Sequence, residues 1–320
     1  MENHIDSNLS WNSVCIIGLG VHAQNKLLPA LESSGLQVVA LVSRTPSLAI
    51  SGVQTFSTVA DALSCLPDTT LFVIATPPNI HYAQVKAVIE AGRDVFVEKP
   101  AFLSLKEAVE LSRLACERDV VLVEMLMYLE NNSVQKIIEE LKRASGSVKK
   151  IECQFLIPSV PRGTFRTEES FGNSLLSDMA CYPLSLLAIA GYDLSNLVLV
   201  RDNCQVKENP IFSVKGKSKQ TTIHILVGQD DQYINNLKLE FEDGRKISCE
   251  PFFYGRDGHR ALIRSTKTGE LTEQILESNA YELMFLRRRP EWLATQKNRL
   301  DSLGLVSESL ERLGRQAGLL

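Results

Sequence analysis

Short runs of β-branched and other apolar residues alternate with helix-like segments of ten or more residues between positions 14 and 123. Strands that are apolar on both faces belong in a parallel sheet, which is covered by helices on both sides. The expected fold class for this part of the chain is therefore α/β, a doubly wound parallel sheet. The apolar runs are VCIIG, QVVALVS, LFVIATP, DVFVEKP and VVLVEML.

Local signals support the helix assignments. Ser104 stands where an N-cap residue is expected, and Glu107 follows three residues later as in a capping box. Gly35 and Gly92 come just after two of the helix-like segments, where a C-cap glycine is favoured.

The pattern changes near residue 126. Strand-like segments follow one another without helices between them, Asp243-Gly244 predicts a hairpin, and one amphipathic helix is expected over 175–190. The last 40 residues return to a helical pattern, and the cluster Arg287 to Arg289 reads as a solvated helix-end surface. We expect two domains, an α/β domain at 1–126 and an α+β domain with a large, mostly antiparallel open sheet at 127–320.

Composition narrows the class of protein. Hydrophobic residues make up 44% and charged residues 22%, and the net charge is −4, as in a soluble globular protein. The mild acidity disfavours nucleic acid and anionic membranes as partners, and no apolar stretch approaches the roughly 20 residues of a membrane span. The polar N-terminus does not resemble a signal peptide. The 7 cysteines form no C-x-x-C pair, so we expect reduced thiols, a cytoplasmic location and no metal site.

A glycine-rich turn follows the first apolar run and begins the first helix. Gly18 permits a tight turn, Gly20 with Val21 lets the backbone approach a pyrophosphate, and the small Ala23 allows close contact between helix and strand. A helix N-terminus at this point attracts an anion. The turn and the strand–helix series together predict a Rossmann domain that binds a dinucleotide.

The end of the second apolar run indicates which dinucleotide. An NAD-binding domain has an Asp or Glu here, whereas this chain reads Ser43-Arg44. A hydroxyl and a guanidinium suit the 2′-phosphate of NADP, because arginine forms charge-assisted bidentate bonds with phosphate. We expect NADP(H) to be preferred and NAD(H) to be possible; the alternative is that Arg44 is an ordinary exposed arginine.

Two further motifs make the chain resemble a known family. They are A-T-P-P-N-I-H after the third apolar run, with Thr76, Pro77, Asn79 and His81, and Glu98-Lys99-Pro100 after the fourth. With this spacing from the glycine turn, the chain resembles the glucose-fructose oxidoreductase / inositol dehydrogenase family of nicotinamide-dependent enzymes. The resemblance implies that these residues contact the coenzyme, that Glu98 and Lys99 lie at its nicotinamide end, and that Lys99 binds and polarises the reacting oxygen.

The expected helix over 175–190 extends the resemblance. Its Asp178 and Tyr182 are similar to the Asp and the His or Tyr that the family carries, and residues four apart share one helix face. The resemblance implies that Tyr182 donates the proton and that Asp178 orients the reacting groups; the alternative is a Tyr182 packed in the core. Arg166 follows an F-L-I-P strand, as in nucleotide-sugar 3-ketoreductases. The resemblance implies that Arg166 binds a substrate phosphate or carboxylate; the alternative is that it forms a surface salt bridge.

The resemblance implies hydride transfer between nicotinamide and a carbonyl or hydroxyl carbon, with a keto sugar or sugar nucleotide as substrate. Two alternatives remain open at this stage. One is a cyclitol or aldose dehydrogenase, or a reductase of a non-sugar carbonyl or imine. The other is a catalytically silent NADP(H)-binding regulator. Because related enzymes pair their exposed sheet faces, the resemblance also implies a homodimer or homotetramer.

Overall fold

The computed structural model of the chain describes residues 11–44, 50–144, 146–159, 174–200, 210–253, 259–267, 270–278 and 280–319. The chain divides into two compact units. The first consists of Met1–Met125 and Tyr281–Asp301, and the second of Leu126–Ala280 and Ser302–Leu320.

The first unit contains a parallel sheet with strand order β3-β2-β1-β4-β5-β6. The order reverses direction at β1, which has β2 on one side and β4 on the other, and such a reversal is where doubly wound sheets bind ligands. The expected α/β sheet is confirmed. Its strands are β1 (Ser13–Ile17), β2 (Gln37–Val42), β3 (Gln54–Phe56), β4 (Thr70–Ile74), β5 (Val95–Glu98) and β6 (Leu122–Met125).

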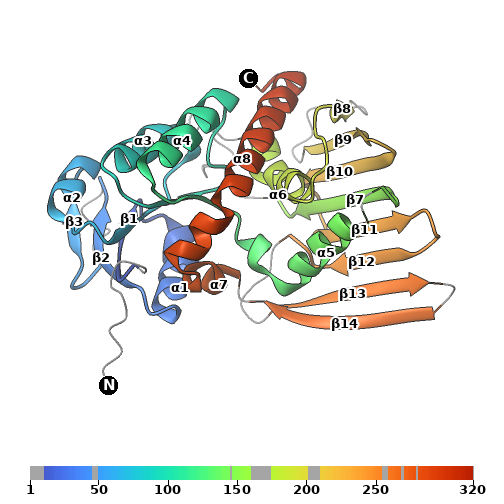
Figure 1. Ribbon diagram of the computed structural model, residues 1–320, viewed down its shortest axis with the longest axis horizontal. Helices are drawn as coiled ribbons and strands as arrows, with labels where there is room; N and C mark the ends of the chain where they lie inside the picture. Colours follow the sequence, from blue (N-terminus) through green and yellow to red (C-terminus); the bar gives the residue numbers. More distant parts are fainter. Residues whose placement is uncertain are drawn as a thin grey trace. The chain divides into compact units, whose positions relative to one another are not determined.

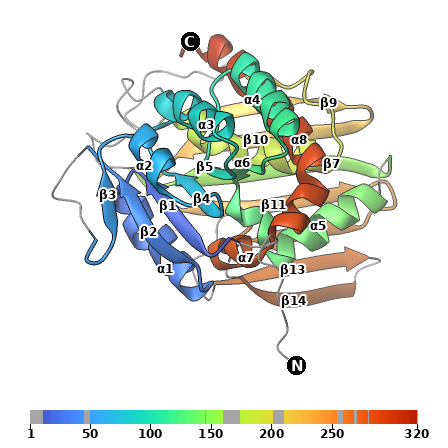
Figure 2. The same ribbon diagram turned by 60° about the vertical axis from the view of Figure 1, so that its left-hand side comes forward.

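The helices of this unit begin and end at recognisable caps. Ser104 accepts the N–H of Glu107 at 3.3 Å, and Gly35 and Gly92 have φ angles of +76° and +71°, as the sequence predicted. The helix after β1 begins with a π-helical turn, η1 (Ala23–Leu27), and continues as α1 (Leu28–Ser33). α3 and α4 lie side by side on one face of the sheet (Figure 2). The remaining bounds are α2 (Val59–Cys65), the 3₁₀ turn η2 (Pro78–Ile80), α3 (His81–Glu90) and α4 (Leu105–Arg118).

The second unit is built on an eight-stranded sheet, and Figure 1 shows its strands as a ladder from β8 to β14. Every pairing is antiparallel except that of β7 with β10, so the expected large, mostly antiparallel sheet is confirmed. The strands are β7 (Val148–Ile157), β8 (Val198–Val200), β9 (Ile211–Ser218), β10 (Thr221–Gln229), β11 (Ile234–Phe241), β12 (Lys246–Glu250), β13 (His259–Lys267) and β14 (Glu270–Ser278).

Helices cover one face of this larger sheet, as Figure 1 shows for α5 and α6. The helical elements are η3 (Met127–Glu130), α5 (Asn132–Arg143) and α6 (Leu175–Ile189). Buried residues alternate with more exposed ones along the strands. In register across β7, β11, β12 and β13, one row of the other face consists of Glu152, Lys238, Ser248 and Arg264.

The segment that contains α7 (Ala280–Leu286) and the start of α8 (Arg289–Ala317) differs from the sequence-based expectation. We expected 127–320 to form one domain, but Tyr281–Asp301 packs with the first unit. The physical reason is the burial of Trp292, which is 1% exposed and stacks edge to face on Phe96 at 5.2 Å.

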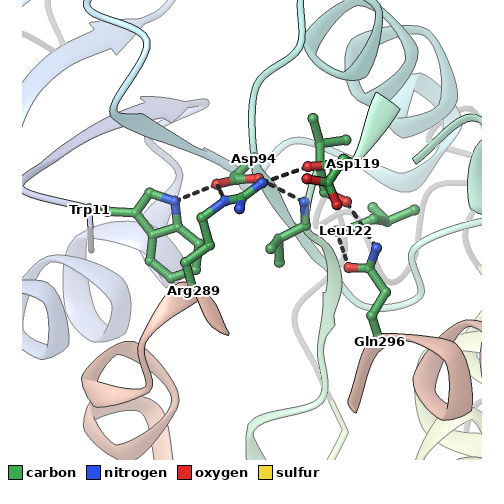
Figure 3. Close-up of polar contacts among 8 residues, drawn as sticks. Trp11, Asp94, Asp119, Leu122, Arg289 and Gln296 are labelled. Atoms are coloured by element: carbon green, nitrogen blue, oxygen red, sulfur yellow. Dashed lines mark hydrogen bonds and ion pairs between the residues drawn. The ribbon is translucent and has the colours of Figure 1, made fainter. Parts of the chain in front are cut away.

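The arginine cluster in this segment is only partly the solvated surface that the sequence predicted: Arg288 is exposed, whereas Arg287 and Arg289 are half-buried. Arg289 donates to Asp94 at 2.8 Å and to the Asp119 carbonyl at 2.6 Å (Figure 3). Arg287 lies over the Trp292 ring at 4.0 Å. Asp94 also accepts from Trp11 at 2.8 Å. Arg289 therefore fastens this segment to the loops that carry Asp94 and Asp119, whereas Arg287 packs within the segment itself.

Candidate functional site

The glycine turn after β1 has the geometry that a pyrophosphate requires. Gly18 adopts φ +90°, donates its N–H to the Val42 carbonyl at 3.0 Å, and could not carry a Cβ, which would lie 2.8 Å from Thr76 Cγ2. A Cβ on Gly20 would meet no atom within 4 Å, so the backbone there faces open space. Val21 is 74% exposed, and Ala23 is 1% exposed. The small Ala23 side chain lets the helix approach the sheet closely.

Ser43 and Arg44 follow β2, next to the glycine turn in the parallel sheet. The Ser43 N–H donates to the Phe56 carbonyl at 3.1 Å, which fixes the end of the strand. Arg44 is exposed, and no carboxylate lies among residues 43–47 of the sequence. An exposed cation thus follows β2, with no carboxylate in the next three residues of the sequence.

The motif after β4 fixes a loop at the same edge of the sheet. Thr76 donates from its hydroxyl to Gln84 at 2.6 Å, Pro77 caps the 3₁₀ turn η2, and Asn79 lies within that turn. His81 begins α3 and is completely buried. The loop is therefore held by side-chain contacts of its own motif.

His81 joins this loop to the Glu98-Lys99-Pro100 motif. Its Nε2 lies 2.8 Å from the Thr76 carbonyl, and its Nδ1 lies 3.2 Å from the carbonyls of both Pro100 and Ala101. Burial lowers the pKa of His81, although the surrounding carbonyls and the Glu98 charge favour the proton. In either neutral tautomer the ring donates to one of the two loops. The sequence placed His81 in the coenzyme site, whereas its contacts link two loops of that edge.

Glu98 is buried at the end of β5 and belongs to a chain of polar contacts. Its Oε1 lies 2.8 Å from His22 Nε2, and the same nitrogen lies 3.0 Å from the Tyr281 hydroxyl. Its Oε2 accepts the backbone N–H of Lys99 at 3.2 Å. The glycine turn, the Lys99 turn and the returning C-terminal segment therefore meet at Glu98.

Glu124, near the end of β6, lies beside the Lys99 turn. Its Oε1 accepts the Ala101 N–H at 2.9 Å. Burial raises the pKa of Glu124 to about 7; the Lys99 charge counteracts this increase, and the Glu98 charge adds to it. Sequence analysis missed Glu124, His22 and Tyr281 as members of this cluster. A carboxyl group near the end of an otherwise apolar run, VVLVEML, is the signal that could have revealed Glu124.

Asp178 and Tyr182 lie in the second unit, four residues apart on α6. The helix begins at a capping box in which Ser174 accepts the N–H of Ser177 at 3.1 Å. Asp178 is completely buried and Tyr182 is 4% exposed. The helical spacing that we expected is present. Arg166 lies outside the described residues.

Tyr182 belongs to an aromatic cluster within the second unit. Its ring lies 5.4 Å from Tyr128 and 5.2 Å from Phe155, and its hydroxyl lies 4.0 Å from the sulfur of Met127. The Tyr128 hydroxyl donates to the Tyr182 backbone carbonyl at 2.8 Å. Tyr182 is thus held firmly in an apolar environment.

The first unit as a whole fits a dinucleotide. Gly18 keeps the strand–helix turn tight, Gly20 leaves room for a pyrophosphate, and Lys99 supplies a cation at the end of β5. Among the described residues, no group of three His, Cys, Asp or Glu side chains could hold a metal ion. None of the described helices is long and apolar enough to cross a bilayer.

Known proteins match both the coenzyme unit and the longer chain. Residues 12–125 match the model of an oxidoreductase family with an NAD-binding Rossmann fold. The chain is 26% identical over 257 residues to the dTDP-3,4-didehydro-2,6-dideoxy-alpha-D-glucose 3-reductase of Actinomadura kijaniata, covering 77% of this chain and 76% of that protein. The enzyme of the same name from Streptomyces antibioticus is 29% identical over 262 residues, covering 78% of each.

A solved structure has the same fold. It is a 3-ketoreductase from Actinomadura kijaniata in complex with NADP and TDP-benzene, with a TM-score of 0.76, 20% identity, and coverage of 92% of this chain and 96% of that one. Residues 12–125 thus match the NAD-binding Rossmann domain of this oxidoreductase family, and the chain is an NAD(P)-dependent oxidoreductase.

Proposed function

We propose that this chain uses NADPH to reduce a ketone on a nucleotide-linked sugar. The observation that carries the proposal is the match, over more than three quarters of the chain, to two enzymes named as 3-reductases of a dTDP-linked keto sugar. The NADP and TDP-benzene of the related solved structure support the same class of coenzyme and substrate.

The preference for NADP(H) over NAD(H) rests on Ser43 and Arg44. Arg44 is exposed directly after β2, where a coenzyme 2′-phosphate would gain a charge-assisted bond. A carboxylate at this point would repel that phosphate, and none is present in the sequence. The backbone around Gly18, Gly20, Val21 and Ala23 would hold the pyrophosphate.

Bound NADPH would supply the hydride for the ketone carbon. The Lys99 ammonium stabilises the negative charge that develops on the ketone oxygen, since a fixed cation favours the alkoxide. Tyr182 donates the proton that completes the alcohol, and Asp178 orients the reacting groups. Lys99, Asp178 and Tyr182 also contact the substrate, and Arg166 binds its phosphate or carboxylate.

A substrate panel tests this function in both directions. We expect NADPH oxidation with a dTDP-linked 3-keto sugar, and slower or no oxidation with simple aldoses, cyclitol ketones and imines. NADP⁺ reduction by a cyclitol or aldose alone would favour the dehydrogenase alternative. Tight NADPH binding without turnover across the panel would contradict the proposal and favour a regulator.

A further inference from the structure

The turn that carries Lys99 is held by side chains from three parts of the first unit. Glu98 accepts the Lys99 N–H at 3.2 Å, and His81 lies 3.2 Å from the carbonyls of Pro100 and Ala101. The third contact comes from β6, where Glu124 accepts the Ala101 N–H at 2.9 Å. Nothing in the proposed mechanism uses Glu124.

The sheet register explains why Glu124 lies here. β5 and β6 are parallel neighbours, and Glu124 is the direct partner of Val97. Val97 precedes Lys99 by two residues, so Glu124 is placed alongside the end of β5 where the turn begins. An apolar residue at 124 would leave the Ala101 N–H without this acceptor.

The charges around Glu124 are opposed. The Lys99 ammonium favours its ionised form, while burial and the Glu98 carboxylate disfavour it. Glu98 itself contacts His22, which also contacts Tyr281, and His81 lies across the Lys99 turn. From α8, the neutral Gln296 approaches β6 through its contacts with the backbone of Leu122 and Val120. Lys99 is thus the cation that acts on the Glu124 carboxylate.

We propose that Glu124 is a positioning residue for Lys99: it fixes the Lys99–Ala101 turn through the Ala101 N–H, and its carboxylate is the charge that faces the Lys99 ammonium from β6. The inference rests on the proposed role of Lys99 in turnover. Electrostatic coupling is reciprocal, so the ammonium that favours the Glu124 carboxylate is itself favoured by it.

The decisive readout is the titration of Lys99, which needs no turnover. Reductive ¹³C-methylation of the whole protein labels its lysines, and the Lys99 signal is the one missing from the Lys99→Ala variant. In the unsubstituted protein this signal should shift in two steps, a small one near pH 7 as Glu124 ionises and a larger one when Lys99 loses its proton. A single step would overturn the inference, and this measurement needs no Glu124 variant to fold.

Glu124→Gln keeps an acceptor for Ala101 but removes the charge. We expect the step near pH 7 to disappear and the Lys99 midpoint to fall by about one pH unit, the size typical of a lost opposite charge at short range. The alkaline limb of kcat/KM should move by the same amount, with the NADPH Kd within about twofold of the unsubstituted protein. An unchanged Lys99 midpoint would contradict the proposed charge effect.

Glu107→Gln is the matched control, because Glu107 also accepts a backbone N–H near this turn, that of Leu103 at 3.3 Å. It should leave the Lys99 titration unchanged.

Glu124→Ala, which removes the acceptor as well, should lower kcat below that of Glu124→Gln; equal kcat values would contradict the positioning role. Near-normal turnover in Lys99→Ala would refute the proposed role of Lys99 itself. An unchanged Lys99 titration in Glu124→Gln would refute only the proposed role of Glu124.

Discussion

The Glu124 carboxyl couples its protonation to folding. Burial raises its pKa from 4.5 to about 7, so between these pH values the folded state binds more protons than the unfolded state. Its contribution to stability is therefore full below about pH 4.5 and is lost as the pH rises through about 7. We expect the unsubstituted protein to lose free energy of unfolding, relative to Glu124→Gln, as the pH rises from about 4.5 to above about 7. Urea titrations at closely spaced pH values measure the difference, and a flat difference would contradict the raised pKa.

The proposed preference for NADP(H) rests on a single side chain, that of Arg44. Replacing it with Ala should raise the KM for NADPH by roughly 10- to 100-fold, as expected for loss of a charge-assisted phosphate contact, and leave the KM for NADH almost unchanged. Arg113→Ala, which removes an exposed arginine from α4, is the matched control. If Arg44 were an ordinary surface residue, both variants would behave alike.

Between elements, Gln296 of α8 covers the edge of the parallel sheet at β6. β6 is the last strand of its sheet, and Gln296 accepts the Leu122 N–H at 3.1 Å and donates to the Val120 carbonyl at 2.9 Å (Figure 3). Gln296→Ala should lower the free energy of unfolding by about 1–3 kcal/mol, because two buried backbone groups lose their partners. Arg315→Ala, with a side chain that is 69% exposed, should change it by less than about 0.5 kcal/mol. Equal urea midpoints for the two variants would contradict this role.

The sequence predicted the helices and strands better than it predicted which of them pack together. Five of the six parallel strands, the helix caps and the position of α6 were predicted correctly, because periodicity and capping are local properties. β3 was missed because it is only three residues long, QTF. β9 (IFSVKGKS) and β14 (ELTEQILES) were missed because they mix apolar residues with several charged or polar ones. The helical pattern of 281–301 was recognised, but only the tertiary structure reveals that Trp292 packs on Phe96.

The same limit applied to the candidate site. Motif spacing located Gly18, Thr76 and Lys99, because a coenzyme-binding turn needs particular residues at fixed positions. It could not reveal contacts between residues far apart in the chain, such as that of His22 with Tyr281, 259 positions away. Roles that depend on a bound substrate, those of Asp178, Tyr182 and Arg166, stay predictions.

At the scale of the whole molecule we expect a homodimer or homotetramer. The edge strand of the larger sheet, β14, carries two exposed apolar side chains: Leu271 is 58% and Ile275 is 59% exposed. Light scattering after size exclusion should give two or four times the 35.6 kDa chain mass. Leu271→Asp should shift the distribution toward the monomer, because a carboxylate disfavours burial in an interface. A monomeric unsubstituted protein at micromolar concentration would contradict the expectation.

The most direct test of the central claim is NADPH oxidation by the unsubstituted protein and Lys99→Ala, with a dTDP-linked 3-keto sugar as substrate. We expect turnover by the unsubstituted protein and a kcat roughly 100- to 1,000-fold lower in the variant, because the ammonium acts on charge that develops during the reaction. The NADPH Kd should be nearly unchanged. Near-normal turnover by Lys99→Ala would contradict the central claim.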